Sequence, residues 1–305
     1  MSPKIVVVGS ANTDMVVRAE SLPRPGETVL GGKFFTAQGG KGANQAVAAA
    51  RLGAQVSFIA RLGQDALGDA ALSAYQNEGI DTRFVFRDPQ DASGVALIVV
   101  NRAGENIITV APGANGRLSP ADVAAADAAI RTADCLLVQL EIPVATVAVA
   151  VEAARHHGVQ VILNPAPARS LPASLLKNVD VLTPNENEVA MLAGVDGGDA
   201  LENGRAIRHK LGVKNVVVTL GSKGALVVGE EPTLVPAFII TPVDTTAAGD
   251  AFNGGLAVAL GRHMDLPEAV RFACAVGALS ATRPGAQPSL PYLKGVEDFM
   301  RLANL

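Results

Sequence analysis

The sequence predicts an α/β protein with a doubly wound, mainly parallel sheet, helices on both of its faces and an additional small β-sheet lid. From residue 54 onward, short continuous apolar runs alternate with helix-length segments, which is typical of parallel strands joined by crossover helices. Two other patches, residues 15–37 and 93–110, read as paired strands. The 305 residues, 49% hydrophobic and 18% charged, describe a well-packed globule.

The first predicted strand covers residues 5–8, a short apolar run that ends in Gly9-Ser10. Asn12 and Asp14 follow directly. In open α/β sheets, ligands bind at the carboxyl ends of the strands, so two polar side chains at this point indicate a binding site. The alternative is an Asx turn that only leads the chain away from the strand.

The two β-rich patches contain their own turn signals. In the first patch, a Pro/Gly turn at residues 22–26 precedes a predicted strand at 28–35. In the second, Asn101-Arg-Ala-Gly104 separates residues 95–100 from 106–110, which indicates a hairpin. Two all-β insertions in an otherwise alternating chain predict a separate small sheet, which we interpret as a lid.

A glycine-rich loop lies between the two patches. It reads Gly39-Gly-Lys-Gly-Ala-Asn-Gln45 and opens an Ala-rich helix that continues to Leu52-Gly53. The loop is of the kind that cradles ligands, but it is neither a P-loop nor a G-x-G-x-x-G motif. Taken alone it indicates a site only weakly.

The remaining elements follow in regular order. Ser119 is predicted to cap a helix with Pro120 just inside its start, and Gly79 and Gly158 are predicted to end two other helices. No internal repeat, charge block or low-complexity linker divides the chain, so residues 1–305 are predicted to form a single domain. The predicted strands cover residues 56–60, 135–140, 161–163, 179–182, 215–220 and 234–240, and the predicted helices cover 66–78, 120–132, 143–157 and 267–281.

The stretch from Asp244 to Asp250, Asp-Thr-Thr-Ala-Ala-Gly-Asp, follows the strand at 234–240 and opens a helix that continues through Leu260. Its small residues leave backbone N–H groups uncrowded, and these groups and the helix dipole together make an anion site. Asp250 is placed there to accept a proton from a hydroxyl group that attacks a phosphate. The alternative is a first-turn acid that only stabilises its helix.

Polar residues follow several different strands and should therefore gather along one rim of the sheet. Each has a plain alternative: Asn185 to Glu188 resembles a helix cap, 219–224 a hairpin turn, and Glu141 a solvated loop acid. Their convergence favours a binding site over these separate explanations. The residues are Asn12, Asp14, Glu141, Asn185, Glu188, the segment 219–224 and the segment 244–250.

Composition argues against several other classes of protein. The formal net charge of -4 and the 4% aromatic content do not favour binding to nucleic acid. No apolar run reaches the roughly 20 residues of a spanning helix, and the start of the chain lacks a signal-type apolar region, so no membrane is expected. The four histidines show no zinc-ligand spacing. Cys135 and Cys274 are expected to be buried free thiols, which suits a cytoplasmic protein.

The sequence resembles the ribokinase-like carbohydrate kinase family over essentially its whole length. The first family signature is the run from Gly39 to Asn44, continued by Gly53 and Gly63, and the second is the run from Asp244 to Asp250. The two signatures in this order, with Asn185-Glu-Asn-Glu188 between them, are highly specific. Residues 39–50, 111–115 and 139–143 are more similar to the ribokinase branch than to the fructokinase or adenosine kinase branches.

The resemblance implies transfer of the γ-phosphoryl group of ATP to the 5-hydroxyl group of D-ribose. It implies that Asp250 deprotonates this hydroxyl and that Ala247, Ala248 and Gly249 form the anion hole. The sugar ligands it implies are Asn12, Asp14, Gly40, Lys41, Asn44, Glu141 and Asp250. The nucleotide ligands it implies are Asn185, Thr219, Gly221, Ser222, Gly224, Gly249 and Cys274. Cys274 departs from the pattern, because some relatives have a larger polar residue there.

The resemblance also implies two metal ions and a dimer. Asn185 and Glu188 would position the phosphates and Mg²⁺ through water, and the lid would pair two subunits into a homodimer. The Pro-rich loop at 283–289 turns carbonyl oxygens outward, and hard cations prefer such ligands. The K⁺ ligands implied, mostly through backbone oxygens, are Asp244, Thr246, Ser280, Arg283, Gly285 and Ser289; the alternative is a solvent-facing loop.

Other functions stay open at this point. One is a kinase for 2-deoxyribose or another small furanose sugar. Another is a catalytically silent regulator that binds a sugar or a nucleotide on the same fold. The retention of Asp250 and of the small residues before it argues against a silent protein.

Overall fold

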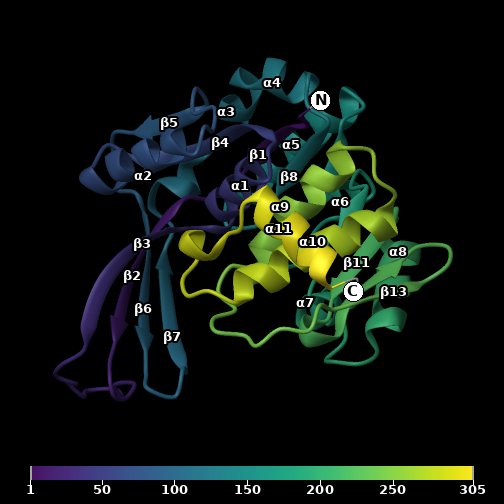
Figure 1. Ribbon diagram of the computed structural model, residues 1–305. Coiled ribbons are helices and arrows are strands. Elements are labelled where there is room, and N and C mark those ends of the chain that lie inside the picture. Colours follow the sequence, from purple (N-terminus) through teal and green to yellow (C-terminus); the bar gives the residue numbers. More distant parts are fainter. Residues whose placement is uncertain (1, 304–305) are drawn as a thin grey trace.

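A nine-stranded sheet forms the centre of the computed structural model, which describes residues 2–303 (Figure 1). Its strands are β1 (Lys4–Val8), β4 (Gln55–Gly63), β5 (Val85–Asp88), β8 (Cys135–Val138), β9 (Gln160–Leu163), β10 (Val181–Leu182), β11 (Asn215–Thr219), β12 (Gly224–Val228) and β13 (Thr233–Pro236). They lie in the order β13-β12-β11-β10-β9-β8-β1-β4-β5. All neighbours from β11 to β5 are parallel, and β12 and β13 add an antiparallel edge. The mainly parallel sheet predicted from the sequence is confirmed.

Helices cover both faces of this sheet. They are α1 (Lys41–Arg51), α2 (Ala66–Asn77), α3 (Pro120–Ala125), α4 (Asp127–Arg131), α5 (Val144–His156), α6 (Ala173–Leu176), α7 (Glu186–Ala193), α8 (Ala200–Leu211), α9 (Ala248–Gly261), α10 (Leu266–Ala281) and α11 (Leu293–Leu302). Because strand side chains alternate, Ile5 and Val7 of β1 pack with α1, α2, α9, α10 and α11, whereas Val6 and Val8 pack with α3 to α8. The two separate cores show the doubly wound arrangement.

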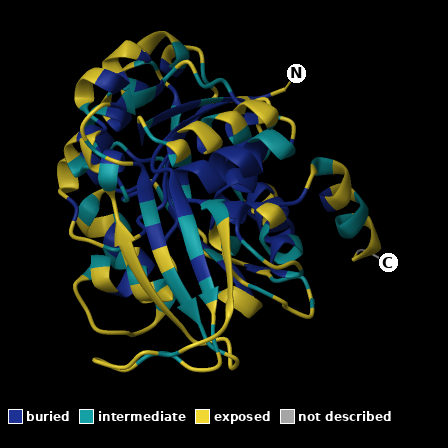
Figure 2. Cartoon of the chain, turned by 90° about the vertical axis from the view of Figure 1, so that its left-hand side faces the viewer, coloured by how far each residue is buried: buried dark blue, intermediate teal, exposed yellow. Residues whose placement is uncertain are grey.

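A second, four-stranded sheet projects from one end of the main body, at the lower left of Figure 1. Its strands are β2 (Asn12–Arg18), β3 (Lys33–Gly39), β6 (Gly94–Val100) and β7 (Asn106–Ala111), in the order β3-β2-β6-β7. Burial falls along these strands: β2 starts buried at Asn12, and β7 is exposed along its whole length (Figure 2). The small sheet predicted from the two β-rich patches is therefore present.

The strands of the small sheet differ from the prediction at their starting points. Asn12 and Asp14 do not lie in a turn but inside β2. In this strand they pair with Gly39 and Ala37 of β3. The predicted strand at 28–35 also starts later, at Lys33. The small sheet thus begins at the edge of the main sheet where β1 ends, and β2 places Asp14 close to that edge.

Other predicted elements are also wrong in extent. The predicted helix at 120–132 is two helices, α3 and α4, because the backbone at the fully buried Ala126 leaves the helical conformation, with φ −98° and ψ 7°. Ser119 nevertheless caps α3 in a capping box with Asp122, as the prediction required. The predicted strand at 234–240 ends at Pro236, which has no N–H group with which to extend the sheet.

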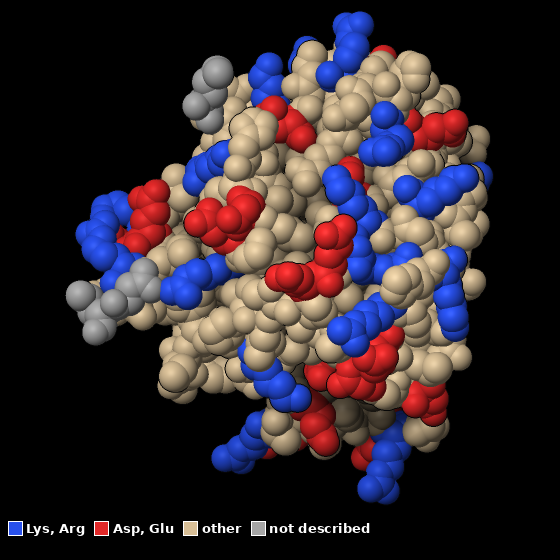
Figure 3. Space-filling view, turned by 90° about the vertical axis from the view of Figure 1, so that its right-hand side faces the viewer, with Lys and Arg blue, Asp and Glu red and all other residues tan. Residues whose placement is uncertain are grey.

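The surface carries both signs of charge. On the face shown in Figure 3, Lys and Arg side chains lie interspersed with Asp and Glu side chains. Both cysteines are free and buried, as predicted. Among residues 2–303, no helix is long and apolar enough to cross a membrane.

Candidate functional site

The predicted polar residues meet around the first turn of α9. Asp250 accepts hydrogen bonds from Asn44 Nδ2 at 2.9 Å and from Gln45 Nε2 at 3.0 Å, one on each carboxylate oxygen. Both amides come from α1, which packs closely on α9 because Gly254 has no side chain; a Cβ there would lie 2.6 Å from Ala48 Cβ. The glycine-rich loop and the Asp250 motif, 206 residues apart at Asn44 and Asp250, therefore build one site.

Asp250 is buried, at 7% exposure, and this burial raises the pKa of its carboxyl group above the ordinary value. The charge of Lys41 and the two amide hydrogen bonds oppose the shift without cancelling it. A carboxylate with a raised pKa is a stronger base than an exposed one. Its capacity to accept a proton is lost when the pH falls through this raised value.

The first turn of α9 presents free backbone donors. Ala247, at its N-terminus, has φ 59°, a left-handed conformation that non-glycine residues adopt rarely. The Ala248 N–H group donates to Thr245 O at 3.1 Å, so it is already used. Within residues 2–303, the N–H groups of Gly249 and Asp250 have no hydrogen-bond partner. Two unpaired N–H groups at a helix N-terminus are what the anion site predicted for this turn requires.

Lys41 and Glu141 lie beside Asp250. One oxygen of Glu141 accepts from Ser10 Oγ at 2.5 Å and from the Lys41 backbone N–H at 3.0 Å, which holds the start of α1 against the end of β8. Burial lowers the pKa of the Lys41 ammonium, but the charges of Asp250, Glu141 and Glu188 outweigh it and the net shift is upward. Lys41 therefore stays positively charged among these carboxylates.

Asn12 and Asp14 reach the same rim from β2. The Asn12 side-chain oxygen accepts from Asn115 Nδ2 at 2.7 Å, which leaves the Asn12 amide nitrogen as the group available to a ligand. Burial, with the nearby charges of Glu141 and Asp250, raises the pKa of Asp14 to about 6. Asp14 and Asp250 are thus two carboxylates of the same site with raised pKa values, a common property of ligand sites.

A cavity of about 690 Å³ opens on the other side of the α9 N-terminus. The residues that line it include all those predicted to bind the nucleotide: Asn185, Thr219, Gly221, Ser222, Gly224, Gly249 and Cys274. Residues 237–240, which were predicted to be a strand, line it instead. Gly224 has φ 106°, and a Cβ there would overlap the Val235 carbonyl oxygen, so this turn requires glycine. Gly249 and Thr245 line this cavity next to Asp250, which joins the two halves of the site.

Asn185 and Glu188 form a reciprocal capping box at the start of α7. Asn185 Oδ1 accepts from Glu188 N at 2.8 Å, and Glu188 Oε2 accepts from Asn185 N at 2.8 Å. The alternative interpretation of this pair as a helix cap is therefore confirmed. Glu188 Oε1 takes no part in the cap, and the bridge from Asn185 to Thr219 places Asn185 in the lining of the 690 Å³ cavity.

The Pro-rich loop is tied to the Asp244 motif. Asp244 accepts from Thr246 N at 2.9 Å on one oxygen and from Gly285 N at 2.9 Å on the other. Ser280 and Ser289 are fully buried, and their hydroxyl groups lie 2.8 Å apart. In the part of the chain that the structure describes, the carbonyl oxygen of Ser280 accepts from Arg283 N, whereas those of Asp244, Thr246, Arg283, Gly285 and Ser289 accept no hydrogen bond. These unused oxygens fit a monovalent cation.

Across residues 2–303, no three or more His, Cys, Asp and Glu side chains are arranged to hold a metal ion directly. A cation at the Pro-rich loop would depend on backbone oxygens, and one near Glu188 would depend on water and phosphate oxygens.

Sequence reasoning missed several side chains that position the site. Ser10 donates a hydrogen bond to Glu141, Asn115 donates one to Asn12, and Gln45 donates one to Asp250. Gln139 and Asn164 in turn contact Gln45. All five lie in or beside segments that the sequence marked as loops or family strings. For Ser10, Gln139 and Asn164 the available signal was their place just after a strand, but the partners of all five are far away in the sequence.

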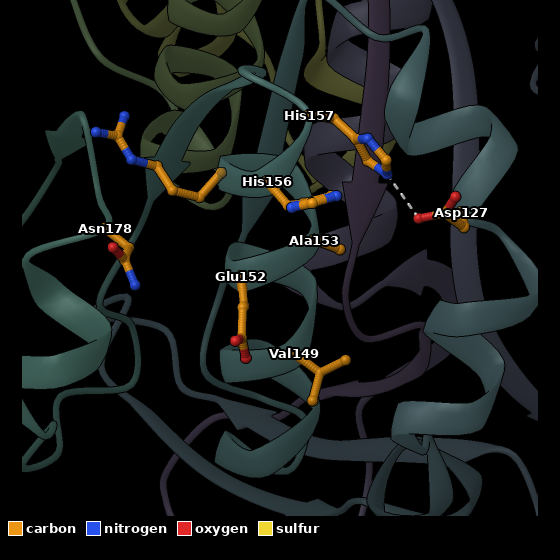
Figure 4. Close-up of a pocket in the computed structure, with 8 residues that line it drawn as sticks. Asp127, Val149, Glu152, Ala153, His156, His157 and Asn178 are labelled. Carbon is orange, nitrogen blue, oxygen red and sulfur yellow. Dashed lines mark hydrogen bonds and ion pairs between the residues drawn. The ribbon is translucent and has the colours of Figure 1, made fainter.

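A second hollow, of about 610 Å³, lies at the C-terminal end of α5 (Figure 4). Its lining includes Asp127, Glu152, His156 and His157, with His157 Nε2 2.8 Å from Asp127 Oδ1. The start of α5 lies near Glu141, whereas the α5 residues that line the hollow begin at Val149. None of the predicted site residues lines it.

Comparison with known proteins gives a consistent result. The family model described as "pfkB family carbohydrate kinase" matches residues 2–293. The chain is 42% identical to a ribokinase of Haemophilus influenzae, over 99% of this chain and 100% of that protein. It is 37% identical to a deoxyribokinase of Salmonella typhi, over 98% of this chain and 99% of that protein.

The fold agrees with solved structures of the same kind. An Arabidopsis thaliana ribokinase complexed with ribose and ATP superposes with a TM-score of 0.90 at 35% identity, covering 99% of each chain. A ribokinase of Thermotoga maritima superposes with a TM-score of 0.88 at 38% identity, covering 97% of this chain and 99% of that one. With a family match over nearly the whole chain and a rim that carries both family signatures in one site, the chain belongs to the pfkB family of carbohydrate kinases.

Proposed function

We propose that this protein transfers the γ-phosphoryl group of ATP to the 5-hydroxyl group of D-ribose, giving D-ribose 5-phosphate and ADP. The observation that carries the proposal is the position of Asn44. Its amide nitrogen donates to Asp250, while its buried side-chain oxygen has no hydrogen-bond partner within residues 2–303. A sugar supplies the missing donor through one hydroxyl group and can place another against Asp250.

The two substrates meet at the start of α9. Asn12, Asp14, Gly40, Lys41, Asn44 and Glu141 would hold the sugar on one side, and the cavity that includes Gly249 would hold ATP on the other. Asp250 removes the proton of the attacking hydroxyl group, for which its raised pKa suits it. The N–H groups of Gly249 and Asp250 stabilise the charge of the phosphoryl group in transit.

A magnesium ion belongs to this proposal. Glu188 Oε1, outside the capping box, and the neighbouring Asn185 would hold it through water at the edge of the nucleotide cavity. When bound, Mg²⁺ supplies positive charge that offsets the charge of the ATP phosphates. Glu188 would act through water on the ion, and the capping box with Asn185 fixes the position of its carboxylate.

K⁺ is proposed as a monovalent activator at the Pro-rich loop. Its ligands would be Asp244, Thr246, Ser280, Arg283, Gly285 and Ser289, mostly through the backbone. The ion would hold Thr246 and so the turn that aims the Gly249 N–H group. We expect turnover in K⁺ buffer to exceed turnover in Tris or a bulky organic cation at equal ionic strength, because only K⁺ satisfies these oxygens. Equal rates in both buffers would remove the ion from the proposal.

The small sheet is proposed to act as a lid over the sugar and as the contact between two subunits. Strand alternation and the register of the four strands place Phe34, Leu97 and Ile107 on one face and Asp14 on the other. These three apolar side chains are exposed, Leu97 at 54%. An exposed apolar face opposite the site suits a second copy of the chain, because each lid offers the same surface.

The dimer has a direct test by sedimentation velocity. We expect the wild-type chain to sediment as a dimer at micromolar concentration and Leu97→Glu as a monomer, because a buried carboxylate at the contact is costly. Leu302→Glu is the matched control, since Leu302 is 69% exposed on α11, outside the lid. A wild-type monomer, or a Leu97→Glu dimer, would argue against the lid contact.

Two alternatives are kept. One is a kinase for 2-deoxyribose, which the similarity to a deoxyribokinase favours; the other is a silent sugar-binding regulator. ADP formation with a panel of sugars, in Mg²⁺ and K⁺, separates them. Turnover with ribose is expected, and EDTA is expected to abolish it. Turnover with deoxyribose or fructose but not ribose would overturn the choice of sugar, and no turnover with any sugar would favour the regulator.

We also propose that residues 1–305 form one domain with the lid as an insertion, at about 15–37 and 93–110, and that the protein works in the cytoplasm. The shared core of β1, α1 and α9 supports a single domain. The two buried free thiols suit a reducing compartment.

A further inference from the structure

A chain of buried side-chain amides lies behind Asp250. At its centre is Gln45, which is 0% exposed. Gln45 Nε2 donates to Asp250 Oδ1 at 3.0 Å and to Asn164 Oδ1 at 3.2 Å, and Gln45 Oε1 accepts from Gln139 Nε2 at 2.5 Å. Gln139 and Asn164 directly follow β8 and β9, so two neighbouring strand ends support the amide from α1 that holds Asp250.

The direction of these hydrogen bonds is set by the carboxylate. An ionised carboxylate only accepts hydrogen bonds, so the nitrogen of Gln45 must face Asp250 and its oxygen must face away. Gln139 must then present its nitrogen to that oxygen. Asn164 presents its oxygen to Gln45 and donates its own nitrogen to the Thr183 carbonyl at 3.1 Å. All three amide orientations therefore agree with one state of Asp250, the ionised state.

The surrounding residues leave room for this arrangement and extend it to the anion site. Gly9 has no side chain, and a Cβ there would overlap Gln139 Oε1. Thr183 donates through its hydroxyl to Asn253 Oδ1 at 2.6 Å, and Asn253 Nδ2 donates to Gly249 O at 2.8 Å. The same buried network thus reaches both the carboxylate of Asp250 and the first turn of α9.

Gln45 has no donor left for a substrate. Its amide nitrogen carries two hydrogens, and both are used, one by Asp250 and one by Asn164. Asn44 differs, because its buried oxygen is without a partner among the described residues and is available to a sugar. The two adjacent amides therefore have different roles. Asn44 has an oxygen available to a ligand, whereas Gln45 makes hydrogen bonds only to buried side chains.

We propose that Gln45 is a positioning residue for phosphoryl transfer, and that Gln139 and Asn164 act through it to keep the carboxylate of Asp250 charged and in a fixed orientation. This inference rests on the proposed function, in which Asp250 is the base. Loss of the Gln45 donor removes a hydrogen bond to the charged form and favours the protonated form. The expected signature is a change in the pH profile and in kcat, with little change in the KM for ribose.

The first variant is Gln45→Met, which keeps the length of the side chain and removes both donors. In single-turnover assays with saturating ribose and ATP, we expect the rate at neutral pH to fall roughly 10- to 100-fold, the effect of losing a hydrogen bond to a charged group. The acid limb of the pH profile should move to higher pH. The KM for ribose should stay within about twofold, because Gln45 does not contact the sugar.

The second variant, Gln139→Met, leaves Gln45 in place and removes only its support. It should move the acid limb in the same direction by a smaller amount. Asn203→Leu is the matched control, because Asn203 is a buried amide of α8 that donates to the Gly197 carbonyl, away from the site. It should lower the melting temperature and leave the acid limb unchanged, as a purely structural loss would.

The outcomes separate this inference from the proposed function. A wild-type chain without sugar kinase activity would overturn the proposed function itself. An active wild type with an unshifted acid limb and an unchanged rate in Gln45→Met and Gln139→Met would overturn the positioning role alone. If Gln45→Met does not fold, as judged by ATP binding and thermal unfolding, Gln139→Met decides the question by the same pH profile.

Discussion

Replacement of Asp250 by asparagine is expected to lower kcat by roughly 10²–10⁴-fold, the usual contribution of a general base. The amide cannot accept the proton of the attacking hydroxyl group. It also presents an N–H group to Asn44 or Gln45, both of which now donate to the carboxylate. Binding of ATP should change little, because Asp250 is not among the residues that line the cavity proposed for the nucleotide. Steady-state kinetics and calorimetric titration with ATP measure the two effects separately.

Asp265 offers the matched control for this experiment. It stands at the start of α10 and accepts a hydrogen bond from Glu268 N, which is only a helix-capping role. Asp265→Asn should preserve both turnover and stability, since asparagine caps helices as well as aspartate does. If Asp250→Asn were as active as Asp265→Asn, Asp250 would be reduced to an acid that stabilises the start of its helix.

Replacement of Gly249 by proline is expected to lower kcat by roughly 10²–10³-fold, the effect of losing one preorganised donor to a charged transition state. Proline removes the N–H group of Gly249, which has no partner within residues 2–303 and points from the first turn of α9. The helix should survive, because α10 already carries Pro267 at the equivalent second position. Single-turnover kinetics measure the loss, and thermal unfolding checks the fold.

Gly249→Ala keeps the N–H group and separates its loss from the effect of added volume. A Cβ at Gly249 has no heavy atom within 4 Å, so alanine fits without displacing the protein. We expect Gly249→Ala to lose less than about tenfold in kcat, well short of the loss of an N–H donor to the transition state. Comparable losses in the two variants would show that the space at Gly249, and not its donor, limits the rate.

Parts of this architecture follow from local patterns in the sequence. Alternating apolar runs and helix-length segments predict the parallel sheet, and the turn signals around residues 101–104 predict the β6–β7 hairpin. The Ser119 cap is likewise predictable, because a capping residue interacts with groups only three residues away. Local patterns fail where a chain segment is shaped by its surroundings, as at the buried Ala126 that separates α3 from α4.

The strand predicted at 234–240 shows the same limit near the site. Its residues have the apolar composition of a strand, yet only the part up to Pro236 pairs with β12. The remainder lines the cavity proposed for the nucleotide. Composition alone does not distinguish an apolar strand from an apolar wall of a cavity, because both use the same apolar residue types.

The sequence by itself determined the fold class, the rim on which polar residues gather, and the two signatures that mark a sugar kinase. Each of these depends on residue types and short spacings. The tertiary structure alone decided which atoms meet: Gln45 with Gln139, 94 residues away, and with Asn164, 119 residues away. Such partners are chosen by the packing of α1 on the ends of β8 and β9. The hydrogen bonds that hold Asp250 in place therefore become visible only in three dimensions.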